Sequence, residues 1–233
     1  MIYVISDLHG YPHERLLQLL EKAGFGKDDF LYILGDVVDR NGDGGVKTLE
    51  WLMYQTNVQL ILGNHEAMLL ANAFVFDELT EDSITAITAE KIDMLTRYQL
   101  DGGNETLSAM KKLPKDTQQD ILDYLHDCPL YELLNVRGKD YLLVHSGIEN
   151  FDKNKKLSEY ADDEFLWARP ALDERYFDEV MIILGHTPTI AYGDEYDGKI
   201  IKTDTWIDID MGAGFGKEPV LLRLDDMKEF RLG

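Results

Sequence analysis

The sequence predicts an α/β fold in which parallel strands are flanked by helices. Three times in its N-terminal part, a short apolar run is followed by a polar loop and then by a helix-like stretch. This alternation is typical of parallel sheets, because parallel neighbours need a crossover connection that is usually helical. Further short strand-like runs follow in the second half, and a 45% hydrophobic content is ordinary for a globular core.

The three opening units have the same parts in the same order. Each strand-like run is apolar and bounded by glycine or polar residues, as expected of a buried strand. The first helix-like stretch places its leucines on one side, as an amphipathic helix does. The runs span 2–6, 30–34 and 58–62, and the helix-like stretches span 14–23, 46–54 and a segment from about 67.

The pattern changes between about residue 72 and residue 127. This part is rich in Asp, Glu, Lys and Leu, and Pro114 stands where its last helix can begin. We interpret 72–127 as a helical insertion that overhangs the site, within a single domain spanning 1–233. The helices are predicted near 90–100, 105–112 and 115–126.

Strand-like runs return after this insertion. Two of them, 131–136 and 140–144, flank Arg137-Gly138-Lys139 and predict a hairpin. Shorter runs follow at 181–184, 206–210 and 220–224.

The charge balance limits the classes of partner. The chain has 23 Lys and Arg against 44 Asp and Glu, a net charge of -21. A nucleic-acid partner is not expected, since duplex binding needs a basic face. The surface also repels phosphorylated substrates at long range, so an anionic ligand must be held by local positive charge. Bound metals with one or two arginines would supply it.

Three further features bear on membrane contact and on the compartment. The sequence has no apolar run of 18 residues, so we expect no membrane partner. Residues 1–7 read as a buried strand rather than a signal peptide. The single cysteine, Cys128, cannot form an internal disulfide and has no basic partner that would activate it, so a cytoplasmic location is expected.

Polar residues follow the predicted strands at equivalent places. Asp7 and Asp36 are 29 positions apart, and Asp36 and Asn64 are 28 apart. Because ligand sites in open α/β sheets form beyond the carboxyl ends of the strands, these loops are expected to meet at one edge. Four of the six histidines lie at such strand ends, and turn chemistry alone does not explain them. The set is Asp7, His9, Asp36, Asp39, Arg40, Asn64, His65, His145 and His186.

This set predicts two divalent metal ions. It offers oxygen and imidazole nitrogen without a thiolate, which suits manganese, iron or zinc. The ligands are too many for one closed site, and a central carboxylate such as Asp36 can bridge two ions. Paired metals serve in-line displacement at phosphorus by activating water and stabilising the attacking and leaving oxygens.

Five motifs in register resemble the calcineurin-like metallophosphoesterases. They cover residues 7–187, and the match looks closest to the phosphoprotein phosphatase branch with its bacterial and phage serine/threonine phosphatases. The resemblance implies a four-layer α/β/β/α sandwich. The motifs are Asp7-Leu8-His9-Gly10, Gly35-Asp36-Val37-Val38-Asp39-Arg40, Gly63-Asn64-His65-Glu66, Val144-His145-Ser146-Gly147 and Gly185-His186-Thr187.

The same resemblance implies a role for each motif residue. Asp7, His9 and Asp36 would hold the first metal, and the second would be held by Asp36, Asn64, His145 and His186. A hydroxide between the metals would attack phosphorus without a covalent phosphoenzyme.

The remaining motif residues are implied to serve the substrate. His65, oriented by Asp39, would be the general acid, and Arg40 would grip phosphate oxygens. Arg169, in a Trp-containing segment like the family's, would be a second phosphate ligand.

Two departures bear on the substrate. Pro188 stands where nucleases of the superfamily have a second metal-binding histidine, which disfavours a nuclease. Leu62 stands where protein phosphatases usually have an arginine. A leucine at this position resembles the symmetrical dinucleoside tetraphosphate hydrolases, although these usually lack the Asp39 equivalent. We expect a phosphoserine or phosphothreonine protein substrate, with a dinucleoside polyphosphate as the alternative. A catalytically silent metal-binding scaffold is the non-enzyme alternative.

Overall fold

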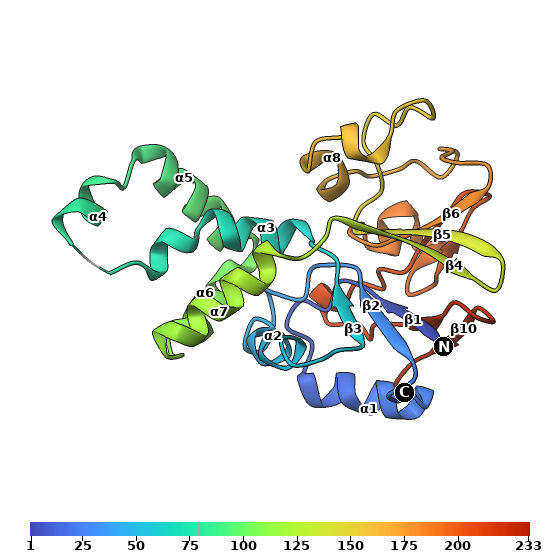
Figure 1. Ribbon diagram of the computed structural model, residues 1–233, viewed down its shortest axis with the longest axis horizontal. Coiled ribbons are helices and arrows are strands. Elements are labelled where there is room, and N and C mark those ends of the chain that lie inside the picture. Colours follow the sequence, from blue (N-terminus) through green and yellow to red (C-terminus); the bar gives the residue numbers. More distant parts are fainter. Residues whose placement is uncertain (79) are drawn as a thin grey trace.

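The computed structural model describes residues 1–78 and 80–233; residue 79, within the predicted insertion, lies outside the described residues. The strands form two five-stranded sheets (Figure 1). The first has the order β10-β9-β1-β2-β3, in which β1, β2 and β3 are parallel and β9 and β10 are antiparallel additions. The strands are β1 (Ile2–Ile5), β2 (Phe30–Ile33), β3 (Val58–Leu60), β9 (Leu221–Arg223) and β10 (Lys228–Phe230).

The second sheet has the order β4-β5-β6-β8-β7. The predicted hairpin is confirmed, since β4 pairs antiparallel with β5 from Tyr131 opposite Val144 to Val136 opposite Lys139. Strands β5, β6 and β8 run parallel, so their carboxyl ends meet at one edge. The strands are β4 (Tyr131–Val136), β5 (Lys139–Val144), β6 (Val180–Leu184), β7 (Ile201–Lys202) and β8 (Trp206–Asp208).

Hydrophobic side chains form three layers of core around the two sheets. Along β1, Tyr3 and Ile5 face a core shared with the helices, whereas Val4 faces a core between the sheets. This split follows from the period of two along a strand. The outer side of the second sheet, with Leu142 and Ile182, packs on the segment that contains α8 (Asp163–Leu166). The predicted two-sheet α/β sandwich is therefore confirmed, although its outer layer on the second sheet is mostly loops and short turns.

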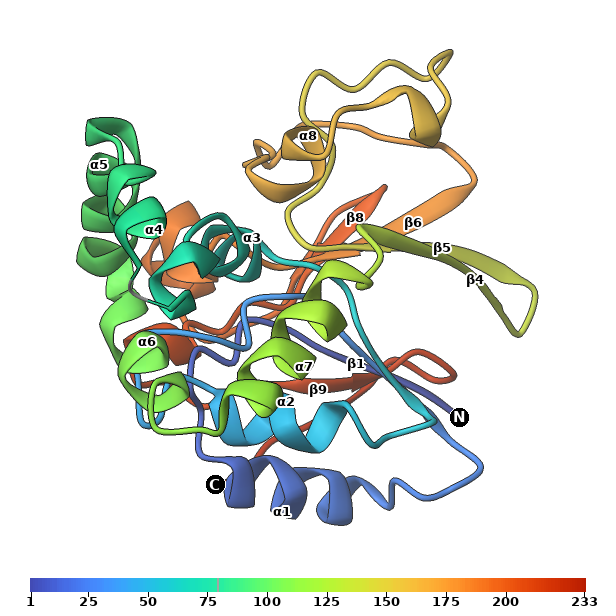
Figure 2. The same ribbon diagram turned by 60° about the vertical axis from the view of Figure 1, so that its left-hand side comes forward.

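Helices α1 (His13–Ala23) and α2 (Val46–Leu52) lie beneath the first sheet (Figure 2). The apolar spacing Leu16, Leu19, Leu20, Ala23 gives α1 one buried face. The third helix, α3 (Asn64–Ala71), begins about three residues before the predicted start. The helix starts there because the Glu66 carboxylate caps its first turn by accepting the backbone N–H of Gly63 at 3.1 Å.

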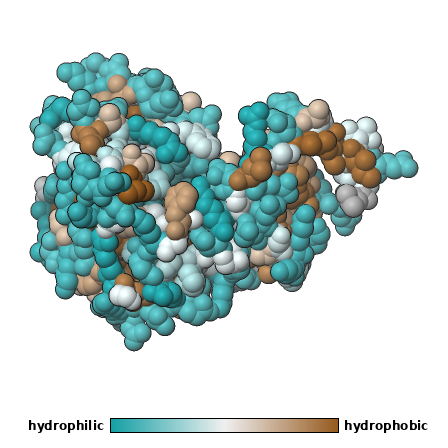
Figure 3. All heavy atoms as spheres, turned by 180° about the vertical axis from the view of Figure 1, so that it is seen from behind, coloured by the Kyte–Doolittle hydropathy of each residue, from teal (hydrophilic) through white to brown (hydrophobic). Residues whose placement is uncertain are grey.

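The described residues between α3 and β4 are mostly helical, as predicted. Part of it projects from the body as an arm made of α4 and α5 (Figure 1). The arm carries the exposed apolar residues Ile84, Ile87 and Ile92, and hydrophobic residues run along it in Figure 3. The helices are α4 (Glu81–Thr85), α5 (Ala89–Tyr98), α6 (Asn104–Met110) and α7 (Lys115–His126), with the turn η2 (Gln99–Gly103) between α5 and α6.

Within the described part of the chain, no helix is long and apolar enough to cross a membrane.

Cys128 is expected to resist thiol reagents in the native protein. It is buried in the core shared with the helices, and its Sγ contacts the Tyr124 carbonyl at 3.3 Å. Burial, followed by the charges of Glu66 and Asp127, raises the pKa of the thiol to about 12. At pH 8 a disulfide reagent such as DTNB should label the native chain far more slowly than the urea-unfolded chain, since the thiolate is the nucleophile. Equal rates in the two states would contradict this burial.

Candidate metal centre and active site

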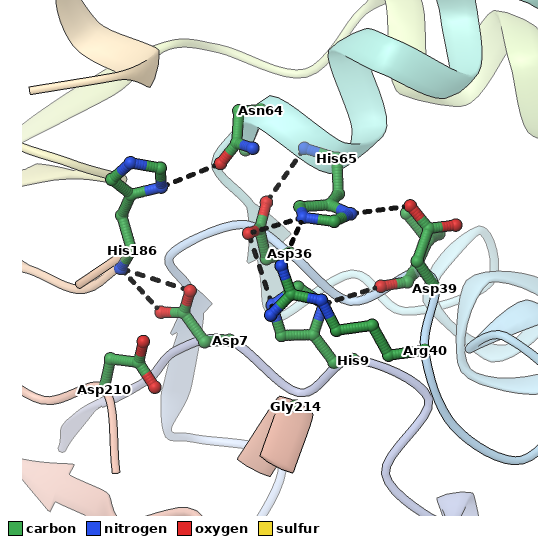
Figure 4. A network of polar contacts seen from close by, with 12 residues as sticks. Asp7, His9, Asp36, Asp39, Arg40, Asn64, His65, His186, Asp210 and Gly214 are labelled. Carbon is green, nitrogen blue, oxygen red and sulfur yellow. Dashed lines mark hydrogen bonds and ion pairs between the residues drawn. The ribbon is translucent and has the colours of Figure 1, made fainter. Parts of the chain in front are cut away.

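The predicted site residues other than Arg169 lie beyond strand ends, on loops or at the start of α3, and most of them are labelled in Figure 4. Several have a left-handed backbone, which costs free energy in a non-glycine residue and often marks functional sites. Tight packing explains the adjacent glycines, since a Cβ on Gly35 would lie 2.6 Å from the Gly63 Cα. The left-handed residues are Asp7, His9, Asp36, Asp39, Arg40 and His186, with φ between 41° and 76°.

Asp36 lies at the centre of the cluster. Its Oδ2 lies 3.4 Å from His9 Nε2, and its Oδ1 lies 3.4 Å from His145 Nε2. Carbonyl oxygens hold the other ring nitrogens of both histidines: Val38 O lies 3.0 Å from His9 Nδ1, and Leu34 O lies 2.7 Å from His145 Nδ1. Both imidazoles therefore present Nε2 to the carboxylate, one on each side, as a bridging ligand requires.

Asn64 joins the two histidines that come from the second sheet. Its Oδ1 lies 2.7 Å from His145 Nε2 and 2.9 Å from His186 Nδ1. The ligand atoms of Asp36, His145 and His186 all lie within 4.8 Å of one another, which is compatible with one metal ion. These contacts bring together the four residues predicted for the second metal.

The grouping on the other side differs in detail from the predicted one. The group found there consists of His9, Asp36 and His65, whose ligand atoms all lie within 4.8 Å of one another. Asp7 does not join this group. The Asp7 carboxylate instead accepts the backbone N–H of His186 at 3.0 and 3.1 Å, and a hydrogen bond from the neighbouring Ser6 hydroxyl. Asp7 thus ties the loop after β1 to the loop after β6.

His65 and Asp39 form a buried pair. His65 Nδ1 lies 2.7 Å from Asp39 Oδ2, and both side chains are at most 1% exposed. The insertion holds the second carboxylate oxygen, since Tyr98 and Thr106 donate to Asp39 Oδ1 at 2.7 and 2.6 Å. Residues from the insertion therefore fix the orientation of the His65 ring, a role that sequence reasoning missed.

Arg40 reaches across the cluster. Its Nη1 lies 3.3 Å from His9 Nε2, and its Nη2 lies 3.0 Å from His65 Nε2. The turn η2 holds the rest of the side chain: Asp101 Oδ1 accepts from Nη2 at 3.2 Å, and Gly102 O accepts the Arg40 backbone N–H at 3.0 Å. The insertion thus positions this guanidinium as well as Asp39.

Arg169 lies at the surface on the His186 side. It donates from Nη1 to Thr187 Oγ1 at 3.3 Å, and its charge contributes to lowering the pKa of both His145 and His186. The structure therefore brings Arg169 to the edge of the cluster, where its side chain is exposed.

Glu66 supports the loop that carries Asp36. Its buried carboxylate accepts the backbone N–H groups of Asp36, Val37 and Val38 at 2.8, 2.7 and 3.1 Å, in addition to that of Gly63. This network fixes the left-handed turn that aims Asp36.

Burial shifts the pKa values of the two histidines from the second sheet in the direction that metal ligation requires. It lowers the pKa of His145 to about 3 and that of His186 to about 2, so both rings are neutral and can bind a cation. Burial also raises the pKa of Asp7 and Asp36 well above the ordinary carboxyl value, with further contributions from nearby carboxylates. A cation in the cluster would remove the cost of these buried charges.

The donor set fits divalent cations. Among the described residues, His186 Nε2 is buried without a hydrogen-bond partner, an arrangement that is costly unless another group fills the site. Asp210, which sequence reasoning did not select, lies beside Asp7 (Figure 4). Burial raises the pKa of Asp210 to about 7, and its charge contributes to raising that of Asp7. Its position at the end of the predicted strand 206–210 was the signal that could have identified it.

Removing the donors to Asp39 is expected to impair turnover more than stability. The double variant Tyr98→Phe/Thr106→Val leaves Asp39 Oδ1 without its two hydroxyl donors. We expect kcat to fall about 10–100-fold, the usual effect of losing a supporting residue that orients a functional histidine. Steady-state kinetics and a thermal melt check this together. An unchanged kcat would show that the insertion does not orient His65.

The chain belongs to the calcineurin-like phosphoesterase family: the model of that family matches residues 1–210. This membership confirms the resemblance carried by the five motifs. The expectation of a metal-dependent phosphoesterase agrees with this membership, and the cluster supplies Asp and His groups that could hold metal ions.

Curated relatives include symmetrical bis(5'-nucleosyl)-tetraphosphatases. The protein of Acidovorax sp. (strain JS42) is 27% identical over 148 residues, which cover 63% of this chain and 44% of that protein. The protein of Buchnera aphidicola subsp. Acyrthosiphon pisum (strain 5A) is 44% identical over 71 residues, covering 30% of this chain and 25% of that protein. The matches therefore span less than half the length of these relatives.

Solved structures confirm the fold. A structure assigned provisionally as a diadenosine tetraphosphatase has a TM-score of 0.64 at 16% identity, covering 99% of this chain and 92% of its own. A Saccharomyces cerevisiae serine/threonine phosphatase with similarity to human PP5 has a TM-score of 0.56 at 18% identity, covering 94% and 71%. A cold-active protein-tyrosine phosphatase of Shewanella sp. has a TM-score of 0.55 at 18% identity, covering 100% and 80%.

Proposed function

We propose that this chain hydrolyses a phosphoanhydride bond in a dinucleoside polyphosphate. The similarity to symmetrical bis(5'-nucleosyl)-tetraphosphatases carries this proposal, since one such relative is 27% identical over 63% of the chain. The motifs alone had favoured a phosphoprotein substrate, and Leu62 had favoured the dinucleotide. The similarity to these relatives supports the dinucleotide.

A phosphoserine or phosphothreonine protein is the second candidate. The His65–Asp39 pair and Arg40 favour it, because these residues resemble those of the phosphoprotein phosphatases. A catalytically silent scaffold is disfavoured, since the family's expected bridging ligand, Asp36, and its expected general acid, His65, are both present and in contact with their neighbours.

We infer that Asp7, His9, Asp36, Asn64, His145 and His186 hold two divalent cations, with Mn²⁺ as the first choice and iron or zinc as alternatives. Such ions activate water and neutralise phosphate charge when bound.

The protein side chains have distinct tasks in this proposal. His65 Nε2 lies 3.0 Å from Arg40 Nη2, so the ring stands beside the phosphate that Arg40 would grip. In its protonated form the ring would give the Nε2 proton to the leaving oxygen. Asp39 fixes the tautomer and orientation of that ring. Arg40 and Arg169 supply positive charge in a chain whose net charge is -21, and so retain an anionic substrate locally.

A substrate comparison tests this proposal. Purified protein, stripped of metal and refilled with Mn²⁺, is assayed on diadenosine tetraphosphate, a phosphothreonine peptide and p-nitrophenyl phosphate. We expect kcat/KM to be highest for diadenosine tetraphosphate, with ADP as its nucleotide product, which indicates symmetrical cleavage. A preference for the peptide would instead support the second candidate, and absence of turnover on all three despite bound metal would support a scaffold.

A further inference from the structure

We propose that Phe215 and Trp167 are the stacking surfaces for the two bases of the substrate, one on each side of the metal centre. This inference rests on the proposed function and adds the residues that would let the site select a dinucleotide over a simple polyphosphate. Neither ring belongs to the metal-ligand set, and the sequence analysis gave no role to Phe215.

Phe215 presents its ring beside the arginine that is expected to bind phosphate. It ends the short turn η6 (Ala213–Phe215), which lies between Gly212 and Gly216, both in the left-handed conformation. The ring is 68% exposed, and the Arg40 guanidinium carbon lies 5.2 Å from its centroid. The turn approaches the cluster closely, since a Cβ on Gly214 would lie 2.7 Å from His9 Cδ2.

A recess of about 410 Å³ extends from this ring along η2. Leu100 lines it and is 84% exposed, so two large apolar side chains face solvent directly beside Arg40. Exposed apolar side chains that gather at a charged site commonly mark a ligand surface. A flat group joined to a phosphate held by Arg40 would cover them.

Trp167 offers a second ring on the other side. It is 41% exposed, and its ring stands perpendicular to that of His186 with the centroids 5.9 Å apart. It borders a second recess of about 480 Å³, which shares Asp101 with the first and whose other walls include Asn64, Met68 and Met94. This recess therefore starts at a predicted metal ligand and continues over mainly apolar side chains.

The two rings suit a ligand with a charged middle and two flat ends. His186, which Trp167 contacts, and Arg40, which Phe215 contacts, lie on opposite sides of Asp36 (Figure 4). A polyphosphate over the metal centre would direct one nucleoside to each side. Stacking is suited to this acidic surface, because it adds affinity without a positive charge.

The test compares Phe215→Ala and Trp167→Ala with the wild-type protein on diadenosine tetraphosphate and on inorganic tripolyphosphate, which has no base. Loss of one stacked base is expected to raise KM for the dinucleotide about tenfold. The loss in kcat/KM should be at least fivefold larger for the dinucleotide than for tripolyphosphate. Phe215→Tyr and Trp167→Phe, which keep an aromatic ring, should retain most of the kcat/KM for the dinucleotide. Tyr54→Ala, which removes an 81% exposed ring that belongs to neither recess, is the matched control.

Several outcomes would overturn the inference. Equal losses on both substrates would mean that the rings only support Arg40 or His186. No loss on either would mean that they do not touch the substrate, and a selective loss on a phosphothreonine peptide would assign them to a peptide. If wild-type protein hydrolyses the dinucleotide and the alanine variants do so equally well, only this inference fails. If wild-type protein hydrolyses p-nitrophenyl phosphate but no dinucleotide, the proposed function fails with it. Phe215→Leu repeats the test should the alanine variant not fold.

Discussion

Replacement of His65 by asparagine is expected to lower kcat about 10²–10⁴-fold on a substrate with a poor leaving group, such as phenyl phosphate. The expected cause is the loss of the proton that His65 Nε2 gives to the leaving oxygen. With p-nitrophenyl phosphate the loss should be much smaller, since p-nitrophenolate leaves without a proton. Steady-state kinetics on the two esters measure this difference directly.

Asp39→Asn serves as the companion variant. It keeps the shape of the side chain but removes the carboxylate that lies 2.7 Å from His65 Nδ1. It should show the same dependence on the leaving group, and the double variant should lose little more than His65→Asn alone, because the two residues act as a unit. Equal losses on both esters in His65→Asn would rule out a general-acid role and would leave His65 as a binding residue.

Replacement of Asp36 by asparagine is expected to abolish metal-dependent turnover while stabilising the metal-free protein. Asp36 contacts histidines on both sides of the cluster, so its loss should reduce kcat/KM by about 10³-fold or more. The buried carboxylate has a raised pKa, and its contribution to stability is therefore lost as the pH rises through that value. The metal-free variant should accordingly melt higher than the metal-free wild type, by about 2–4 °C for each kcal/mol.

Thermal melts with and without Mn²⁺ check this second prediction. Metal should raise the melting temperature of the wild type clearly and that of Asp36→Asn little, because only the wild type has the central carboxylate. The stability difference between the metal-free proteins should grow as the pH rises above the ordinary carboxyl range. A metal-free variant that melts lower than the wild type would show that Asp36 stabilises the fold through its hydrogen bonds rather than destabilising it through its charge.

Most of the fold could be predicted because it depends on local patterns. The strands that hold the site are short apolar runs, and α7 spans the predicted residues 115–126. Two strands were not predicted: β7 has only two residues, and two of the three residues of β10 are charged, so neither forms an apolar run. They form because neighbouring strands provide edges for hydrogen bonding. These edges exist only in the tertiary structure, so the local sequence does not reveal them.

The position of the site could also be predicted, since strand-end residues of parallel sheets converge at one edge. The contacts made by the insertion could not. Tyr98 and Thr106 lie 59 and 67 positions from Asp39, and no local pattern connects them to it. Leu62 was one reason for considering a dinucleotide substrate. Its side chain packs against the core shared with the helices, so packing is a second reason for a leucine at this position.

The most direct test of the metal centre is a titration of the metal-stripped protein with Mn²⁺. Bound metal is measured by elemental analysis in the same samples that are assayed for hydrolysis of p-nitrophenyl phosphate. We predict no turnover in the stripped protein and full turnover at two Mn²⁺ per chain, with His186→Ala unable to reach that level. Turnover in the stripped protein, or full turnover at one Mn²⁺ per chain, would contradict a two-metal site formed by these six residues.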